Sequence, residues 1–295
     1  MYNPSTLLQF LMSGIGVGCI YGLVGMGFTV VYNATGIVNF AQGGFVMLGG
    51  MTTYLLYAVA GLPLLPAATL AIVVVGGIGY LMELAVIRPL RKRQAPIFVL
   101  ILATLAVQVI LENVTLHAVD DQPHLLPPFT DRNPFMLFHA SIGFQTLWII
   151  GISLLMVFAL GLLYRRTLIG KAMRACAINP EVAQILGIRI ERITAIAFAL
   201  SAALGAIGGI LITPTQYTAF YIGLTFAVSG FVAAIIGGLG NALGAFVGGI
   251  ILGILQAAGV IFIDAGYKNV IAFSMLLLLL FLRPNGLFGS LIEHD

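Results

Sequence analysis

Charged residues are scarce in this sequence of 295 residues. Asp, Glu, Lys and Arg together make up 8% of it, whereas soluble domains carry about 25%. Because 60% of the residues are apolar, too few ionisable side chains remain to coat a soluble domain. The same composition excludes a disordered chain, collagen and a coiled coil. A lipid bilayer is the solvent that suits such a chain.

Cysteine and histidine are scarce as well. Cys19 lies in an apolar run and Cys176 in a basic stretch, so we expect no disulfide between them. The four histidines are scattered and show no metal-ligand spacing, and no nucleophile motif is present. The sequence therefore predicts a protein that is not an enzyme and has no metal or other cofactor.

A phosphate-binding loop is also missing. The only Gly-Lys pair is Gly170-Lys171, and Arg165 occupies the position where a Walker motif needs its first glycine. Ala172 stands where Ser or Thr would hold magnesium. Any ATP hydrolysis must therefore come from a partner.

Long apolar runs and 36 glycines dominate what is present. A membrane-spanning helix needs about 20 apolar residues. The first apolar run has no basic segment before it, so we expect this run to be retained rather than cleaved as a signal peptide. The fold class we predict is an all-α polytopic membrane protein with about eight or nine transmembrane helices, some of them broken by glycine. The predicted spans are 7–31, 37–60, 64–87, 97–119, 143–164, 193–213, 221–239, 242–262 and 269–283.

Basic residues set the orientation of these spans. Ten of the 13 Lys and Arg residues lie in two stretches, 88–93 and 165–192, which we place in the cytoplasm. The connection between them, 120–141, carries Asp120, Asp121 and Asp131 and is predicted to be external. The N-terminus is then outside and the C-terminal tail inside. Because the basic residues are split between short loops, we expect no nucleic-acid partner.

The second cytoplasmic stretch, 165–192, predicts a short helix of its own near 180–186. Asn179 can cap it, Pro180 suits its first position, Glu181 faces the positive end of its dipole, and Gly187 can close it. Its side chains are more apolar than a solvated loop needs. The helix therefore either lies on the bilayer or docks into another protein.

Polar side chains within the spans are the candidates for a transport pathway. Asn39, Gln42 and Gly43 have the spacing of one helical face, which predicts either a polar lining or an interhelical hydrogen bond. Glu112 is the deeper carboxylate and is a candidate for either a pathway or a structural contact. Glu83 lies one turn from the basic loop, so we expect it either to snorkel toward the membrane surface or to pair with Arg88.

Glycine recurs at every fourth position in two places, at 14, 18 and 22 and again at 240, 244 and 248. Glycine-interrupted segments in both halves are typical of transporters built from repeats. The alternative is that glycine is simply abundant in this chain.

Four segments resemble the permease subunits of branched-chain amino acid ABC importers of the LivH type. They follow the order of that family across nearly the whole chain. The segments are GIVNFAQGGFVMLGG at 36–50, GKAMRACAINPEVAQILGI at 170–188, IIGGLGNALGAFVGG at 235–249 and LRPNGLFG at 282–289.

The resemblance implies one transmembrane permease domain over residues 1–295, located in the bacterial cytoplasmic (inner) membrane. It implies four kinds of partner: a homologous second permease, two ABC ATPase subunits, an external substrate-binding protein and the surrounding bilayer. It also implies that stretch 165–192 couples the permease to the ATPases. The coupling contacts would be Arg174, Asn179, Glu181, Ala183 and Gly187, and the translocation pathway would include Asn39, Gln42, Gly43 and Glu112.

The sequence departs from the family pattern at Gly44, where many members carry an acidic residue, so a role of that carboxylate does not carry over. The cargo implied is a branched-chain amino acid, with urea, short amides or aromatic acids as alternatives. A stand-alone secondary transporter is a further alternative, which would have only Glu83, Glu112 and Asp264 as carboxylates near the membrane. A structural subunit of a larger membrane complex stays open as well.

Overall fold

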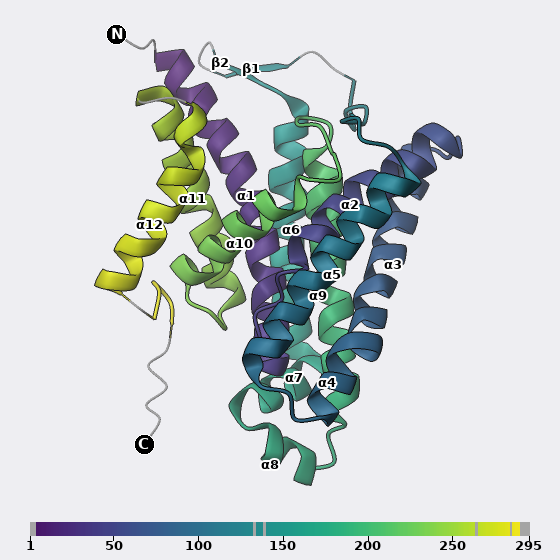
Figure 1. Cartoon of the computed structure of the whole chain (residues 1–295). Helices are drawn as coiled ribbons and strands as arrows, with labels where there is room; N and C mark the ends of the chain where they lie inside the picture. The colour runs from purple at the N-terminus through teal and green to yellow at the C-terminus, as the bar shows by residue number, and fades with distance from the viewer. Residues whose placement is uncertain (1–3, 132–133, 138–139, 263–264, 284, 290–295) are drawn as a thin grey trace.

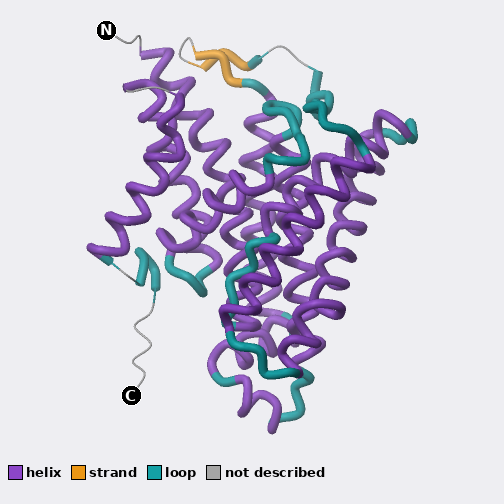
Figure 2. The backbone as a smooth tube through the Cα atoms, in the orientation of Figure 1, coloured by secondary structure: helices purple, strands orange, loops and turns teal. Residues whose placement is uncertain are grey.

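The structure is a computed structural model that describes residues 4–131, 134–137, 140–262, 265–283 and 285–289. Helices make up most of it, with loops mainly at the two ends of the bundle (Figure 2). The α-helices are α1 (Pro4–Thr35), α2 (Gln42–Tyr54), α3 (Leu64–Met82), α4 (Arg88–Lys92), α5 (Ile97–Ala118), α6 (Phe144–Arg166), α7 (Leu168–Ile178), α8 (Pro180–Ile185), α9 (Ile190–Ile212), α10 (Gly223–Gly237), α11 (Ala242–Phe262) and α12 (Lys268–Leu282).

Three shorter helical turns and one hairpin complete the described elements. Two π-helical turns, Leu55–Val59 and Glu83–Ile87, continue α2 and α3, and a 3₁₀ turn, Ala265–Tyr267, precedes α12. Strands β1 (Phe135–Leu137) and β2 (Ala140–Ile142) pair antiparallel, with Met136 opposite Ser141. The sequence analysis predicted neither the hairpin nor α7 as a separate helix.

An apolar helix overlaps each of the nine predicted ranges, and α1, α6, α9 and α12 extend beyond theirs by one to four residues at an end. Within the described residues, six helical stretches are long and apolar enough to cross a membrane, and α10 and α12 are shorter apolar helices. The helix in the predicted span 37–60 begins only at Gln42. The preceding helix α1 continues to Thr35 and is ended by Gly36, which has a left-handed φ of 70°. The chain is therefore a multi-pass membrane protein.

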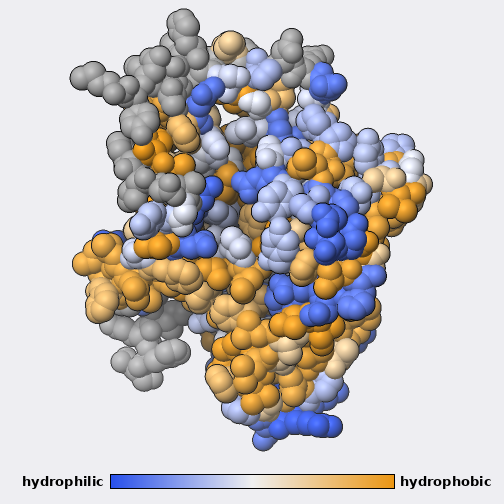
Figure 3. Space-filling view, turned by 45° about the horizontal axis from the view of Figure 1, so that its top comes forward, coloured by the Kyte–Doolittle hydropathy of each residue, from blue (hydrophilic) through white to orange (hydrophobic). Residues whose placement is uncertain are grey.

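The two stretches predicted to be cytoplasmic, 88–93 and 165–192, lie at the same end of the bundle (Figure 1). α4, α7 and α8 lie together at the lower end of the bundle, and α4 and α7 carry five basic residues: Arg88, Arg91, Lys92, Lys171 and Arg174. The β1–β2 hairpin and the start of α1 lie at the opposite end. Figure 3 shows a belt of apolar residues between a hydrophilic upper region and a hydrophilic lower tip.

The core lies where α1, α2, α9 and α10 meet. Nearly all of α2 and most of α9 are buried, whereas α5 buries only Leu100, Thr104, Gln108 and Thr115. The rest of α5 and much of α6 present large apolar side chains outward. These outer faces suit lipid or another membrane subunit.

Glycine allows α1 and α11 to pack very closely. A Cβ atom at Gly18 would lie 2.8 Å from the Gly249 carbonyl oxygen and 2.8 Å from Ile250 Cα, and one at Gly14 would lie 2.9 Å from the Gly253 carbonyl oxygen. Such close backbone contact is what small residues provide in membrane bundles. The first glycine array therefore faces α11, while Gly244 and Gly248 of the second face α10 instead.

Candidate coupling loop and buried polar network

The stretch 165–192, predicted to be cytoplasmic, folds back across the end of α6. The Thr167 hydroxyl caps α7 by accepting from the Gly170 amide at 3.0 Å. A Cβ at Gly170 would meet the Leu163 carbonyl oxygen and Tyr164 Cα, so this glycine serves helix packing. It is not the glycine of a phosphate loop.

The predicted capped helix is confirmed as α8. The Asn179 side-chain oxygen accepts from the amides of Glu181 at 3.0 Å and Val182 at 3.1 Å. Gly187 follows the helix with a left-handed φ of 84° and donates its amide to the Gln184 carbonyl at 3.0 Å. Pro180 occupies the first helical position.

One side of α8 is buried against the rest of the chain, and the other side is exposed. Ala183 is buried against the chain, whereas Ile178 is 86% exposed and Ile185 84% exposed. Leu186 is exposed too. α8 lies at the lower tip of the molecule, beyond the end of α6 and the start of α9 (Figure 1). Such an exposed apolar surface outside the spanning helices is typical of a docking site.

An ion-pair cluster joins the first basic stretch to the start of α9. Arg88 contacts Glu83 at 3.0 Å, which confirms the pairing expected from the sequence. Arg88 also contacts Glu191 at 3.2 Å, and the Thr194 hydroxyl donates to the buried Glu83 carboxylate at 2.9 Å. The cluster therefore fixes α9, which directly follows the coupling loop, against the end of the α3 helix.

Gln42 lies at the centre of the bundle and is fully buried. Its amide nitrogen donates to the Ser201 carbonyl at 3.0 Å, and its side-chain oxygen accepts from the Ser201 hydroxyl at 2.6 Å. Ser201 also lies within 2.8 Å of the Gly27 carbonyl. Gln42 thus connects α2 to α9 and α1, an interhelical contact of the kind the sequence allowed.

Asn39 and Gly43 flank this contact. Asn39 is fully buried, and its side-chain oxygen accepts from the Ala41 amide at 3.1 Å, which shapes the turn into α2. Its amide nitrogen has no hydrogen-bond partner among the described residues. Gly43 lets the backbone of α10 approach, because a Cβ there would meet the Gly223 carbonyl oxygen.

Glu112 joins the same region through Gln108. The Gln108 side-chain oxygen accepts from the Gly44 amide, and its nitrogen donates to Glu112 at 2.7 Å. Glu112 is only half-buried, on a helix whose outer face is open. A Cβ at Gly44 would lie 2.8 Å from the Gln108 side-chain oxygen, so Gln108 occupies the space that a side chain at position 44 would use.

The predicted site residues therefore form two groups. The coupling residues lie on or beside α8 at the lower end, and the pathway residues lie around the start of α2 (Figure 1). Sequence reasoning did not assign a role to Gln108 and missed Ser201 and Thr194, whose partners lie up to 159 residues away along the chain. Asp264 falls outside the described residues.

The external connection is held to the bundle through His124. Its backbone exchanges two hydrogen bonds of 2.8 Å with Thr218, and its ring stacks on Tyr54 with 3.9 Å between centroids. The His124 ring also contacts Asp120 at 2.8 Å. This hydrogen bond lowers the pKa of the exposed Asp120 carboxyl.

A multi-pass helical bundle with a capped, apolar helix exposed at its basic end defines a membrane transport subunit rather than an enzyme. The family model described as branched-chain amino acid transport system / permease component matches residues 10–280, so the chain belongs to this family.

Two relatives match nearly the whole chain. The high-affinity branched-chain amino acid transport system permease protein BraD of Pseudomonas aeruginosa is 33% identical, covering 96% of this chain and 95% of BraD. The corresponding permease protein LivH of Escherichia coli is 30% identical with the same coverage. The solved structure of PsaBC from Streptococcus pneumoniae in complex with Fab shares the fold at a TM-score of 0.50 and 13% identity, covering 94% of this chain and 92% of that chain.

Proposed function

We propose that this chain is the permease subunit of an ATP-driven importer that carries branched-chain amino acids across the bacterial cytoplasmic (inner) membrane by alternating access. The family and the names of the relatives support this cargo. The observation that supports coupling to an ATPase is α8, a capped helix with exposed apolar side chains outside the membrane-spanning helices. Residues 1–295 would form a single permease domain.

The proposal requires four kinds of partner. A second permease would complete the pathway, two ATPase subunits would supply hydrolysis, and an external protein would deliver the cargo to the loop at 120–141. The bilayer would surround the whole. The open apolar face of α5 offers one surface on which a second membrane subunit can pack.

In the coupling step, α8 would dock on the ATPase and move with it. Arg174, Asn179, Glu181 and Gly187 are exposed and would form the contact region, whereas Ala183 is buried and would not touch the ATPase. Asn179 and Gly187 act by holding the helix ends, and Ala183 by anchoring its inner side. The Arg88–Glu191 contact would pass the movement from the loop to α9 and α3.

In the pathway, Glu112 would be the group nearest to the cargo, because it is the least buried of the predicted set. Gln108 joins it to Gly44, and Asn39, Gln42 and Gly43 would position that wall. A fixed carboxylate beside neutral amides suits the ammonium group of an amino acid zwitterion.

The decisive experiment combines purification with uptake. The tagged chain should copurify from its native membrane with a second permease and ATPases that carry Walker motifs. Recovery of the chain alone, with flux that needs no ATP, would favour a secondary transporter and overturn the proposal.

Coupling is tested by Glu181→Lys and Gly187→Pro. Proline cannot adopt the positive φ at 187, and it lacks the amide hydrogen that Gly187 donates to Gln184, so Gly187→Pro disrupts the end of α8. Both variants should insert normally but lose uptake. Gly187→Asn is the matched control, because asparagine tolerates this backbone conformation. Normal uptake in Glu181→Lys and Gly187→Pro would contradict the coupling assignment.

The pathway is tested by Glu112→Gln, which retains a partner for Gln108 but removes the charge. Uptake of leucine should fall at least tenfold while thermal stability stays close to wild type. Asn113→Ala, at an exposed neighbouring position on α5, is the control. Unchanged uptake in Glu112→Gln would remove Glu112 from the pathway.

A further inference from the structure

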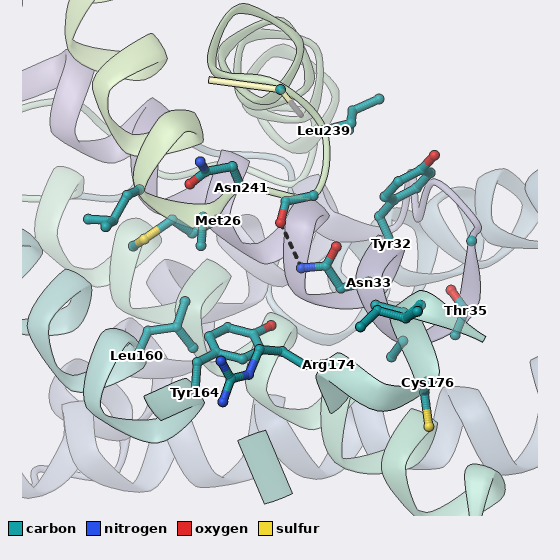
Figure 4. A pocket seen from close by; sticks show the side chains of 18 of the residues that line it. Met26, Tyr32, Asn33, Thr35, Leu160, Tyr164, Arg174, Cys176, Leu239 and Asn241 are labelled. Carbon is teal, nitrogen blue, oxygen red and sulfur yellow. Dashed lines mark hydrogen bonds between the residues drawn. The ribbon is translucent and has the colours of Figure 1, made fainter. Parts of the chain in front are cut away.

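A cavity of about 870 Å³ lies between the coupling loop and the bundle, at the cytoplasmic end. Its walls come from the end of α1, the last turns of α6, α7 and the turn between α10 and α11. Figure 4 shows Asn33, Tyr164 and Arg174 pointing into this space from three different helices. Apart from Arg174, none of the predicted coupling residues and none of the polar network around Gln42 lines it.

The charge on the cavity wall is positive only. Arg91, Arg165 and Arg174 line it, and no Asp or Glu is found among the described lining residues. None of these three arginines forms an ion pair with a carboxylate in the described part of the chain, whereas nearby Arg88 and Lys92 both pair with Glu191. Guanidinium groups gathered without a carboxylate make a site for an anion, and phosphate in particular.

Neutral polar groups and a buried thiol surround the arginines. The Asn33 amide donates to the Gly240 carbonyl at 2.9 Å, and Asn241 lies on the same wall. Burial raises the pKa of the Cys176 thiol, while the positive charge of Arg91 opposes that rise.

The deeper and outer walls are apolar. Val157 and Leu160 of α6 face Met26 of α1, and Leu243 and Phe288 are more than half exposed at the opening. The cavity thus combines basic side chains, unpaired among the described residues, with apolar side chains that are open to the surface. Basic pockets between spanning helices on this side are where anionic lipid headgroups bind.

We propose that this cavity binds the phosphate headgroup of an anionic phospholipid of the inner leaflet, with the acyl chains along the apolar wall at Leu243 and Phe288. The bound lipid ties α7 to α1 and α11 and so stabilises the coupling loop against the bundle. Arg174 then serves this ligand in addition to the ATPase contact. The inference goes beyond the importer proposal and requires no ATPase.

The test uses the full chain purified in a neutral detergent. Its thermal unfolding midpoint is followed while dioleoyl phosphatidylglycerol, dioleoyl phosphatidylcholine or inorganic phosphate is added in separate titrations. Phosphatidylglycerol should raise the midpoint saturably, and phosphatidylcholine should not. A shift with inorganic phosphate at the same concentrations would identify a free-anion site and overturn the assignment to lipid.

The chain offers matched controls for the arginines. Arg165→Gln and Arg174→Gln should each weaken the apparent affinity for phosphatidylglycerol about fivefold, as expected for one basic side chain near an anionic lipid. Arg166→Gln and Arg93→Gln change equally basic side chains that do not line the cavity, and they should bind as wild type does. Equal losses in all four variants would show attraction by general surface charge and overturn the proposal.

A second measurement keeps the test independent of stability. Native mass spectrometry should find one phosphatidylglycerol retained by the wild-type chain and by Arg166→Gln, and lost from the Arg165→Gln, Arg174→Gln double variant. Retention in the double variant would overturn the site. Because neither measurement involves uptake, failure here leaves the importer proposal standing.

Discussion

Arg88, at the end of the third predicted span, lies 3.2 Å from the carboxylate of Glu191 in the first turn of α9. The same guanidinium contacts Glu83, which is 1% exposed, at 3.0 Å. One side chain therefore holds together two helices that the sequence separates by about a hundred residues. The contact lies at the point where the coupling loop ends.

Removing the buried partner should be costly. Glu83→Ala leaves Arg88 and the Thr194 hydroxyl without their acceptor, and we expect a loss of about 2–3 kcal/mol in stability, less than for a fully buried pair because Arg88 is partly exposed. Lys92→Ala removes only an exposed pair with Glu191 and should cost less than about 1 kcal/mol. Thermal unfolding in detergent measures both; equal losses would contradict a structural role for Glu83.

The close approach of α1 and α11 should not tolerate a side chain. Gly18→Val places atoms where the Gly249 carbonyl and Ile250 lie, so we expect at least about 2 kcal/mol of destabilisation. Gly151→Val is the matched control, since a Cβ at this exposed position on α6 meets nothing within 4 Å. If both variants unfold at the same temperature, Gly18 is not needed for the packing of α1 against α11.

The external connection should respond to acid. The pKa of Asp120 is lowered in the folded chain, so the contact with His124 contributes fully above the ordinary carboxyl range and is lost as the pH falls through the depressed pKa. Hydrogen exchange of the Thr218 and His124 amides should therefore accelerate, relative to its intrinsic rate, only in acid. Asp120→Asn should abolish this acid-induced acceleration, and Asp121→Asn, which alters only a contact with Gln122, should not.

The side-chain amide of Gln42 should contribute mainly to the stability of the bundle. Gln42→Met removes two hydrogen bonds to Ser201 inside the bundle, and we expect a loss of about 1–3 kcal/mol. Gln9→Met, which removes one exposed bond to Ser141, should be nearly neutral. Thermal unfolding and leucine uptake should be measured together, because full stability with lost uptake would place Gln42 in contact with the cargo instead.

Features set by neighbours along the chain could be predicted from the sequence. The helix α8 follows from Asn179 and Gly187, which lie at its two ends, and the pairing of Glu83 with Arg88 spans five residues. The spans follow from apolar length, and their orientation follows from where basic residues gather.

Features set by distant partners could not be predicted. The pattern placed Asn39, Gln42 and Gly43 on one polar helical face, which was wrong for Asn39, because this residue lies before the turn that leads into α2. The pattern also could not identify Ser201 as the partner of Gln42. Nor could it show that Gln108 would fill the space beside Gly44. The cavity at the cytoplasmic end depends on three arginines from separate helices, and each of them alone is typical of an inner-leaflet loop.

The bare side of α8 has a consequence for the life of the protein in the cell. Under the proposed function, a newly made chain that has not met an ATPase would present Ile178, Ile185 and Leu186, all exposed here, to the cytosol. Exposed apolar clusters of this kind are what chaperones and quality-control proteases recognise. We therefore expect an unassembled copy to be short-lived, so that the supply of ATPase sets how much of this chain accumulates.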